Sequence, residues 1–203
     1  MRQETINLYQ FDELSERAQR RAWENGPDLS GDSGYEFRAT LEAFEKAFDI
    51  KVYHYNVDDY TYSFDFVTAG RATEAPEGDA LRLARYMWNN YASEIMRGKY
   101  YSTGKWVDGK YQFKSRHSKI NMEMDNCPFT GVFCDMDILG PIIACLHYRE
   151  FFESFDDLIT ACLNDFFKAW QAEIEYRGSL ENFAETAAAN EWEFTETGEM
   201  WCE

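Results

Sequence analysis

The sequence predicts an α+β fold, in which an antiparallel sheet of about three to five strands packs against several amphipathic helices. The stretch KVYHYNVDDYTYSFDFV, from Lys51 to Val67, alternates like two strands joined by a turn at Asp58 and Asp59. Apolar residues recur at helical spacing before it, from Tyr35 to Asp49, and again after position 154. We expect these helices to cover the aromatic face of the hairpin.

Strict alternation assigns every residue of this hairpin to one of two faces. On the first arm, one face holds Val52, His54 and Asn56, and the other holds Tyr53, Tyr55 and Val57. The second arm has an entirely aromatic face, made of Tyr60, Tyr62, Phe64 and Phe66.

The N-terminal stretch Thr5 to Phe11 alternates as a short strand, which we expect to join the sheet of the hairpin. Ser15 is placed to cap a helix with the sequence ERAQRRAWEN, which Gly26 and Pro27 end. The helix from Tyr35 to Asp49 follows a polar loop. Its predicted buried face consists of Phe37, Leu41, Phe44 and Phe48.

A third helix is predicted from Ala80 to Arg97, with Asp79 as its cap and Gly98 as its stop. Its predicted apolar stripe consists of Ala84, Trp88, Tyr91 and Ile95.

The longest predicted helix runs from 155 to 176 and opens with Ser154 as its cap. Its expected buried side consists of Leu158, Ala161, Cys162, Phe166, Ala169 and Trp170. Ser179 then starts a last helix, LENFAETAAAN. Glu191 to Thr195 reads as a terminal strand at an edge of the sheet.

The segment from Arg97 to Lys119 differs from the rest of the chain, because it carries seven basic residues and one acidic residue. Asp108 and Gly109 favour a tight two-residue hairpin turn inside it. Basic residues interleaved with aromatic ones are typical of single-stranded nucleic-acid binding. The favoured interpretation is a solvated hairpin. Its aromatic residues would pack on the rest of the protein, and its positive charges would balance the negative charges of the acidic half of the chain.

Ile120 to Asp125 reads as another strand, and an irregular loop follows it. Asp135 and Asp137 alternate in the way cation ligands do, but calcium needs about six to eight oxygen donors at ordered spacing. Helix capping is therefore the favoured role of these two residues.

The 203 residues carry a net charge of −17 and fit one globular domain. Met1 to Ile120 carries 17 Lys and Arg against 19 Asp and Glu, whereas Asn121 to Glu203 carries 3 against 18. Such an acidic chain argues against direct binding to nucleic acid or to an anionic membrane, because both need a basic surface. A basic protein is the expected partner.

The N-terminus lacks the apolar core of a signal peptide, so we expect a cytoplasmic protein. The longest apolar run, Ile138 to Leu146, is far shorter than the roughly 20 residues that span a bilayer. The five cysteines show no CxxC spacing, and reduced thiols are expected.

The sequence shows no motif for catalysis, a cofactor or a metal. His54, His117 and His147 lie in three different predicted elements, whereas a zinc site needs three or four converging ligands. Cys145 and His147 are two residues apart and would point to different sides of a helix. We therefore predict no catalytic residue, no cofactor and no metal site.

Three stretches resemble a family of small acidic proteins that are common in bacteriophages and prophages. They are INLYQFDELSERAQRRA near the start, CPFTGVFCDMDILGPI in the middle and ANEWEFTETGE near the end. The family pattern contains FDELSE-x-A, TG…D-x-DIL-x-P and A-N-E-aromatic-x-F-T-x-x-G, and the Arg97 to Lys119 segment departs from it. The resemblance implies a mobile-element context and no agreed activity.

This context and the charge lead to one functional hypothesis: an accessory protein that binds and inhibits a nucleic-acid-binding defence protein of the host, such as a CRISPR effector or a restriction enzyme. An acidic face could mimic the phosphates that a basic groove holds. Two alternatives remain open, an antitoxin-like or regulatory partner of another kind of target, and a small enzyme with an unrecognised site. The expected binding residues are Asp156, Asp157, Asp165, Glu173, Glu175, Glu181 and Glu185.

Overall fold

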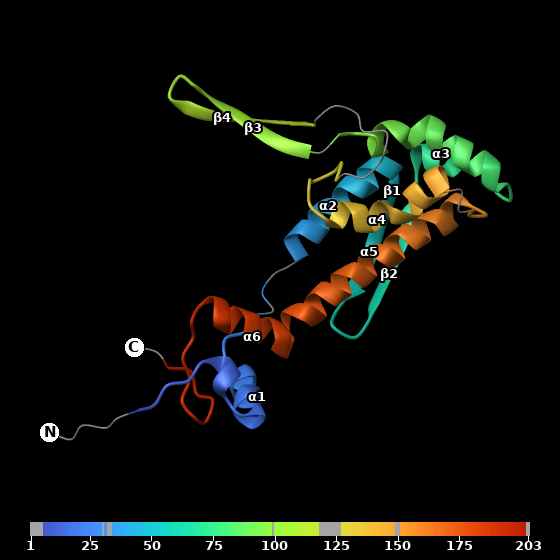
Figure 1. Ribbon diagram of the computed structural model, residues 1–203. Helices are drawn as coiled ribbons and strands as arrows, with labels where there is room; N and C mark the ends of the chain where they lie inside the picture. The colour runs from blue at the N-terminus through green and yellow to red at the C-terminus, as the bar shows by residue number, and fades with distance from the viewer. Residues whose placement is uncertain are drawn as a thin grey trace. The chain divides into compact units, whose positions relative to one another are not determined.

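The computed structural model describes residues 6–29, 31, 34–98, 100–117, 127–148 and 151–201 (Figure 1). For residues 100–104, 111, 113–117 and 148 it describes the backbone alone. The fold is α+β, as predicted. The chain divides into two compact units: unit 1 comprises Met1–Ser33 and Ala172–Glu203, and unit 2 comprises Gly34–Gln171.

Unit 1 is built from helical elements and the two ends of the chain. Its elements are a 3-10 helix η1 (Phe11–Glu13), α1 (Glu16–Asn25), the last turns of α5 (Phe155–Arg177) and α6 (Leu180–Ala189). Phe11 lies at the centre of its core, with its ring 5.5 Å from that of Phe183 and 5.8 Å from that of Phe194. The remaining buried members of this core are Leu14, Ala18, Ala22 and Ala187.

Both predicted serine caps of unit 1 are confirmed. The Ser15 hydroxyl accepts a hydrogen bond from the backbone N–H of Ala18 at 3.4 Å, and α1 spans the predicted residues. The Ser179 hydroxyl accepts one from the N–H of Asn182 at 3.1 Å and starts α6. Each cap satisfies one of the N–H groups that the first turn of a helix leaves without a partner.

The predicted pairing of the N-terminal strand is wrong. Tyr9 donates its N–H to the carbonyl of Phe194 at 2.8 Å and accepts the N–H of Phe194 at 2.9 Å. The predicted terminal strand likewise forms isolated bridges, from Phe194 to Tyr9 and to Met200, in place of an edge of the hairpin sheet. The apolar contact of Phe11 with Phe194 favours this pairing of the two chain ends over pairing with the hairpin.

Gly198 brings the C-terminal segment directly against α1. Its φ is 82°, and a Cβ at this position would lie 2.1 Å from the backbone oxygen of Ala18. Only glycine therefore fits here, both for its conformation and for the close approach. The opening and closing stretches of the sequence thus meet in unit 1.

Unit 2 contains two hairpins and most of the longer helices (Figure 1). Its elements are α2 (Gly34–Phe48), β1 (Ile50–Val57), β2 (Tyr62–Thr68), η2 (Gly70–Glu74), α3 (Ala80–Ile95), β3 (Tyr100–Val107), β4 (Lys110–His117), α4 (Cys134–Ile143), a π-helical turn η3 (Ala144–Tyr148) and α5 as far as Gln171.

The central hairpin is confirmed, but a β-bulge interrupts the predicted alternation of its first arm. β1 pairs with β2 so that Val52 opposes Phe66 while His54 opposes Asp65, which leaves Tyr53 as the extra residue. A bulge shifts the following side chains to the opposite face. Val52 and Tyr55 therefore face the helices together, which strict alternation excludes.

The helices cover the inner face of this hairpin, as predicted. The rings of Tyr55 and Phe64 lie 5.4 and 5.3 Å from that of Phe167 on α5. Val52 is buried. Tyr60 is 88% exposed, contrary to the prediction, because it lies in the turn before β2 begins.

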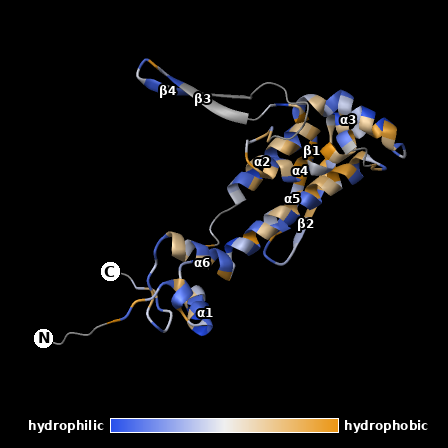
Figure 2. Cartoon of the chain, in the orientation of Figure 1, coloured by the Kyte–Doolittle hydropathy of each residue, from blue (hydrophilic) through white to orange (hydrophobic). Residues whose placement is uncertain are grey.

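Two buried faces of the helices differ in part from the predicted ones. In α3, which Asp79 caps as predicted, Leu83 and Met87 are buried in line with Tyr91, while Trp88 is exposed. In α5 the predicted residues Leu158, Cys162, Phe166 and Trp170 are buried. Figure 2 shows hydrophilic and hydrophobic residues on different parts of α5, as expected for an amphipathic helix.

The basic segment forms a second, separate two-stranded sheet. Val107 pairs with Lys110, so Asp108 and Gly109 make the predicted two-residue turn, with φ of 49° and 75°. Among the described residues the strands form two sheets of two strands each, fewer per sheet than predicted. Trp106, next to the turn, is 72% exposed.

Asp135 lies at the start of α4 and has no contact with solvent. Its Oδ2 accepts the N–H groups of Phe129, Thr130 and Gly131, and its Oδ1 accepts the hydroxyls of Thr40 and Thr130. The carboxylate thus orders the loop before the helix and does not cap the N–H groups of the helix itself. The predicted strand from Ile120 to Asp125 lies outside the described residues.

The cysteines of the described ranges form no disulfide bond, as predicted. Cys134, Cys145 and Cys162 are buried. Burial raises the pKa of Cys134 to about 12, which makes its thiol a poor nucleophile at neutral pH.

Candidate functional site: an acidic surface and a pocket in unit 1

Unit 1 holds most of the negative charge of the chain. Its two segments carry 5 Lys and Arg against 16 Asp and Glu, a net charge of −11. Unit 2 is longer and carries 15 against 21, a net charge of −6. A positively charged molecule would therefore be attracted more strongly to unit 1 than to unit 2.

Three of the predicted binding residues gather around the hydroxyl of Tyr176. Tyr176 lies near the end of α5 and donates a hydrogen bond to Oε2 of Glu185 on α6 at 2.7 Å. This hydrogen bond raises the pKa of Tyr176, and the charges of Glu185, Glu181 and Glu173 raise it further. We call Glu173, Glu181 and Glu185 the acidic surface.

The members of the acidic surface differ in how they are held. Glu181 and Glu185 are exposed on α6. Glu173 is half-buried, and its Oε1 accepts a hydrogen bond from Nε of Arg177 at 2.7 Å. Glu175 is exposed on the same helix, but residues two apart point to different sides of a helix, so it does not join Glu173.

The other three predicted binding residues belong to unit 2. Asp156 and Asp157 are exposed in the first turn of α5, where negative charge is favourable to a helix. Asp165 is exposed, and its charge acts on Asp137 of α4. Burial raises the pKa of Asp137, and the charge of Asp165 raises it further.

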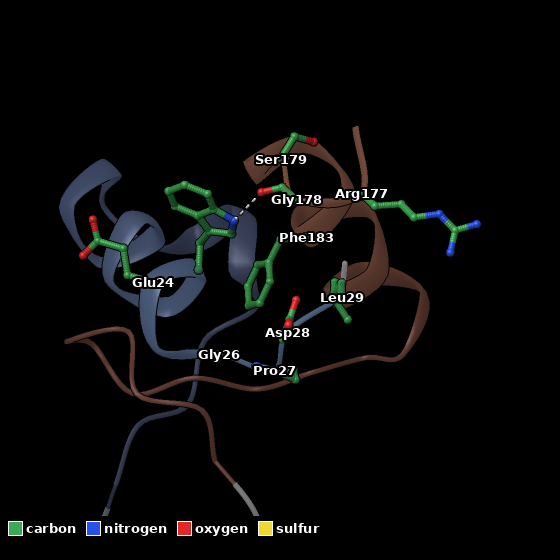
Figure 3. Close-up of a pocket in the computed structure, with 10 residues that line it drawn as sticks. Glu24, Gly26, Pro27, Asp28, Leu29, Arg177, Gly178, Ser179 and Phe183 are labelled. Atoms are coloured by element: carbon green, nitrogen blue, oxygen red, sulfur yellow. Dashed lines mark hydrogen bonds between the residues drawn. The ribbon is translucent and has the colours of Figure 1, made fainter. Parts of the chain in front are cut away.

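A pocket of about 300 Å³ lies in the same unit as the acidic surface (Figure 3). Its walls come from the end of α1, the loop after it, and the turn between α5 and α6. The lining residues are Trp23, Glu24, Gly26, Pro27, Asp28, Leu29, Arg177, Gly178, Ser179 and Phe183. The pocket thus combines aromatic and apolar side chains with two carboxylates.

Two contacts set the shape of this pocket. The indole N–H of Trp23 donates to the carbonyl oxygen of Gly178 at 3.1 Å and joins α1 to the α5–α6 turn. Gly26 passes so close to Phe183 that a Cβ would lie 2.6 Å from its ring. The loop after α1 can approach the ring only because residue 26 is glycine.

Sequence reasoning missed the pocket and the role of Tyr176. One signal was present for Trp23: it lies off the face of α1 that Ala18 and Ala22 bury, directly before the Gly26–Pro27 stop. A single exposed aromatic residue is ordinary on a protein surface, however, so this signal alone does not identify a site. The convergence of Tyr176 with Glu185 depends on how α6 packs on α5, which periodicity does not report.

The basic residues of unit 1 lie mainly on α1. Arg17, Arg20 and Arg21 line a second cavity of about 500 Å³, together with Glu196 and Thr197. Arg21 pairs with Glu199 at 2.7 Å. Arg177 pairs with Glu173 of the acidic surface at 2.7 Å.

Within the described ranges, no group of three or more His, Cys, Asp or Glu residues is arranged to hold a metal ion. No helix in this part of the chain has the length and apolar character needed to cross a membrane. Comparison with known proteins finds no matching family, curated protein or solved structure.

Proposed function

We propose that the protein acts by binding, without catalysis, and that its acidic surface occupies the basic groove of a nucleic-acid-binding host protein. The proposed target is a defence protein of a bacterial host, such as a CRISPR effector or a restriction enzyme. The charge of the chain and the resemblance of its three motifs to bacteriophage proteins support this target class. Inhibition would follow because the groove cannot hold nucleic acid at the same time.

The observation that carries the proposal is the convergence of Glu173, Glu181 and Glu185 on Tyr176. Three carboxylates from two helices gather there, in a unit whose net charge is −11. Like charges repel, so placing three carboxylates together carries an electrostatic cost that solubility alone does not require.

Fixed geometry is what a nucleic-acid mimic needs. A DNA duplex presents one phosphate charge per about 1.7 Å of its axis, and a basic groove is shaped to that density. The hydrogen bonds of Tyr176 with Glu185 and of Arg177 with Glu173 hold two of the carboxylates in place before binding. Side chains that are ordered in advance lose less entropy when the complex forms.

The test is affinity capture from the lysate of a bacterial host, followed by identification of the captured protein. Wild-type protein is compared with a triple variant, Glu173→Gln, Glu181→Gln and Glu185→Gln. A matched control carries Glu42→Gln, Glu77→Gln and Glu153→Gln, three exposed carboxylates of unit 2. Both variants change the net charge equally. A difference in capture between them therefore reflects the position of the carboxylates and not the total charge.

We expect the wild type and the control to capture the same nucleic-acid-binding protein, and the triple variant to lose it. Circular dichroism checks that both variants remain folded. Equal capture by both variants would contradict the proposal, and so would a captured partner without affinity for nucleic acid.

A further inference from the structure

The pocket of unit 1 has an apolar interior and an acidic rim. Trp23, Leu29 and Phe183 supply the apolar lining, and Glu24 and Asp28 supply carboxylates. Arg177 is the basic lining residue, but Glu173 binds its Nε, and Figure 3 shows its side chain extending away from Phe183. The pocket therefore favours a cation that also has an apolar part.

We propose that this pocket receives an arginine side chain of the basic partner, an inference that rests on the proposed function. The aliphatic stem of arginine would pack on Phe183 and Leu29, and its planar guanidinium would stack on the indole of Trp23 near Glu24. Lysine fits less well, because its ammonium is compact, strongly hydrated and unable to stack.

The pocket is formed before any partner arrives. The hydrogen bond from Trp23 to Gly178 fixes the indole, and the close approach of Gly26 to Phe183 fixes the opposite wall. Binding then costs only the conformational entropy that the bound side chain itself loses. Arginine side chains that fill such pockets are also often among the residues that contribute most of the binding free energy at protein interfaces.

The experiment compares two peptides of equal charge and length, octaarginine and octalysine, by calorimetric titration of the full chain. The two peptides carry the same charge, so the long-range attraction to the acidic surface is the same, and the Trp23 variant below isolates the part of any preference that comes from the pocket. We expect octaarginine to bind the wild type about fivefold more tightly, the effect of a partly exposed cation–π contact.

Trp23→Leu should abolish this preference and leave binding to octalysine unchanged. Trp201→Leu is the matched control, because Trp201 is also 39% exposed and lies in the same unit but outside the pocket. Glu24→Gln, at an exposed position, should reduce the preference and provides a second variant if Trp23→Leu does not fold.

The outcomes separate the pocket from the proposed function. Equal affinity of the wild type for the two peptides would overturn the arginine pocket and leave the acidic surface intact. A preference that survives in folded Trp23→Leu and in Glu24→Gln would also overturn it. Failure of both peptides to bind the wild type would overturn the pocket and the proposed function together.

Discussion

The hydroxyl of Tyr176 donates a 2.7 Å hydrogen bond to Glu185 and so ties the end of α5 to α6. Because Glu185 favours the neutral phenol, the pKa of Tyr176 lies above the ordinary tyrosine value. A raised pKa contributes stability below that ordinary value, and the contribution is lost as the pH rises through the pKa of Tyr176 itself.

Removing the charge of Glu185 should therefore lower the pKa of Tyr176 towards its ordinary value. We expect this shift in Glu185→Gln, measured by NMR titration of ¹³C-labelled tyrosine. Glu193→Gln, an exposed carboxylate elsewhere in unit 1, is the control and should leave the titration unchanged. An unchanged pKa in Glu185→Gln would refute the contact.

Asp135 should be a main determinant of the stability of unit 2. Asp135→Ala leaves three backbone N–H groups and two hydroxyls without their acceptor in a buried site, and should cost at least about 3 kcal/mol. Thr40→Val removes one of these hydrogen bonds and should cost about 1 kcal/mol. Chemical denaturation measures both values, and similar small losses in the two variants would contradict this account.

The bulge at Tyr53 yields a test by deletion. Without Tyr53, the side chains of Val52, His54 and Tyr55 would point alternately to the inner, outer and inner face of the hairpin, and β1 would pair with β2 without a bulge. We expect the deletion to fold and to change the free energy of unfolding by no more than about 1 kcal/mol.

Deletion of Asn56 is the matched control, since it would turn Val57 to the outer face and shift the turn. It should destabilise the hairpin clearly more than deletion of Tyr53, as measured by thermal unfolding. The reverse order would show that the bulge itself is needed.

Local signals in the sequence were sufficient to locate α1, α3, α5 and α6 and their caps, but they did not predict α4. Ser15, Asp79, Ser154 and Ser179 each accept a hydrogen bond from the first turn of the helix that they were predicted to start. Such caps depend on residues within one turn of one another, so the sequence contains the whole interaction.

Long-range pairing was not predictable in this way. Alternation gave no sign that Tyr53 would be extra, because a bulge depends on which residues of the partner strand must stay buried. The partner of Tyr9 lies at the other end of the chain. For the candidate site, the position of the apolar face of α5 correctly predicted that acidic residues of this helix face solvent. The convergence on Tyr176 could not be predicted in this way, because it depends on how α6 packs against α5.

The turn of the basic hairpin should be sensitive to a side chain at Gly109. Both turn residues have positive φ, which suits glycine at the second position. Gly109→Ala should destabilise the β3–β4 pairing by about 1 kcal/mol, since a left-handed conformation costs other residues about that much. Asp108→Asn is the control and should be tolerated. Hydrogen exchange of the β3 and β4 amides distinguishes the two variants.

The most direct test of the central claim is displacement of labelled nucleic acid from the captured target by increasing amounts of this protein. We predict that displacement saturates near one equivalent and weakens as salt rises, because it depends on charge. The triple variant at Glu173, Glu181 and Glu185 should need about tenfold more protein. Equal displacement by that variant, indifference to salt, or turnover by a substoichiometric amount would contradict the claim.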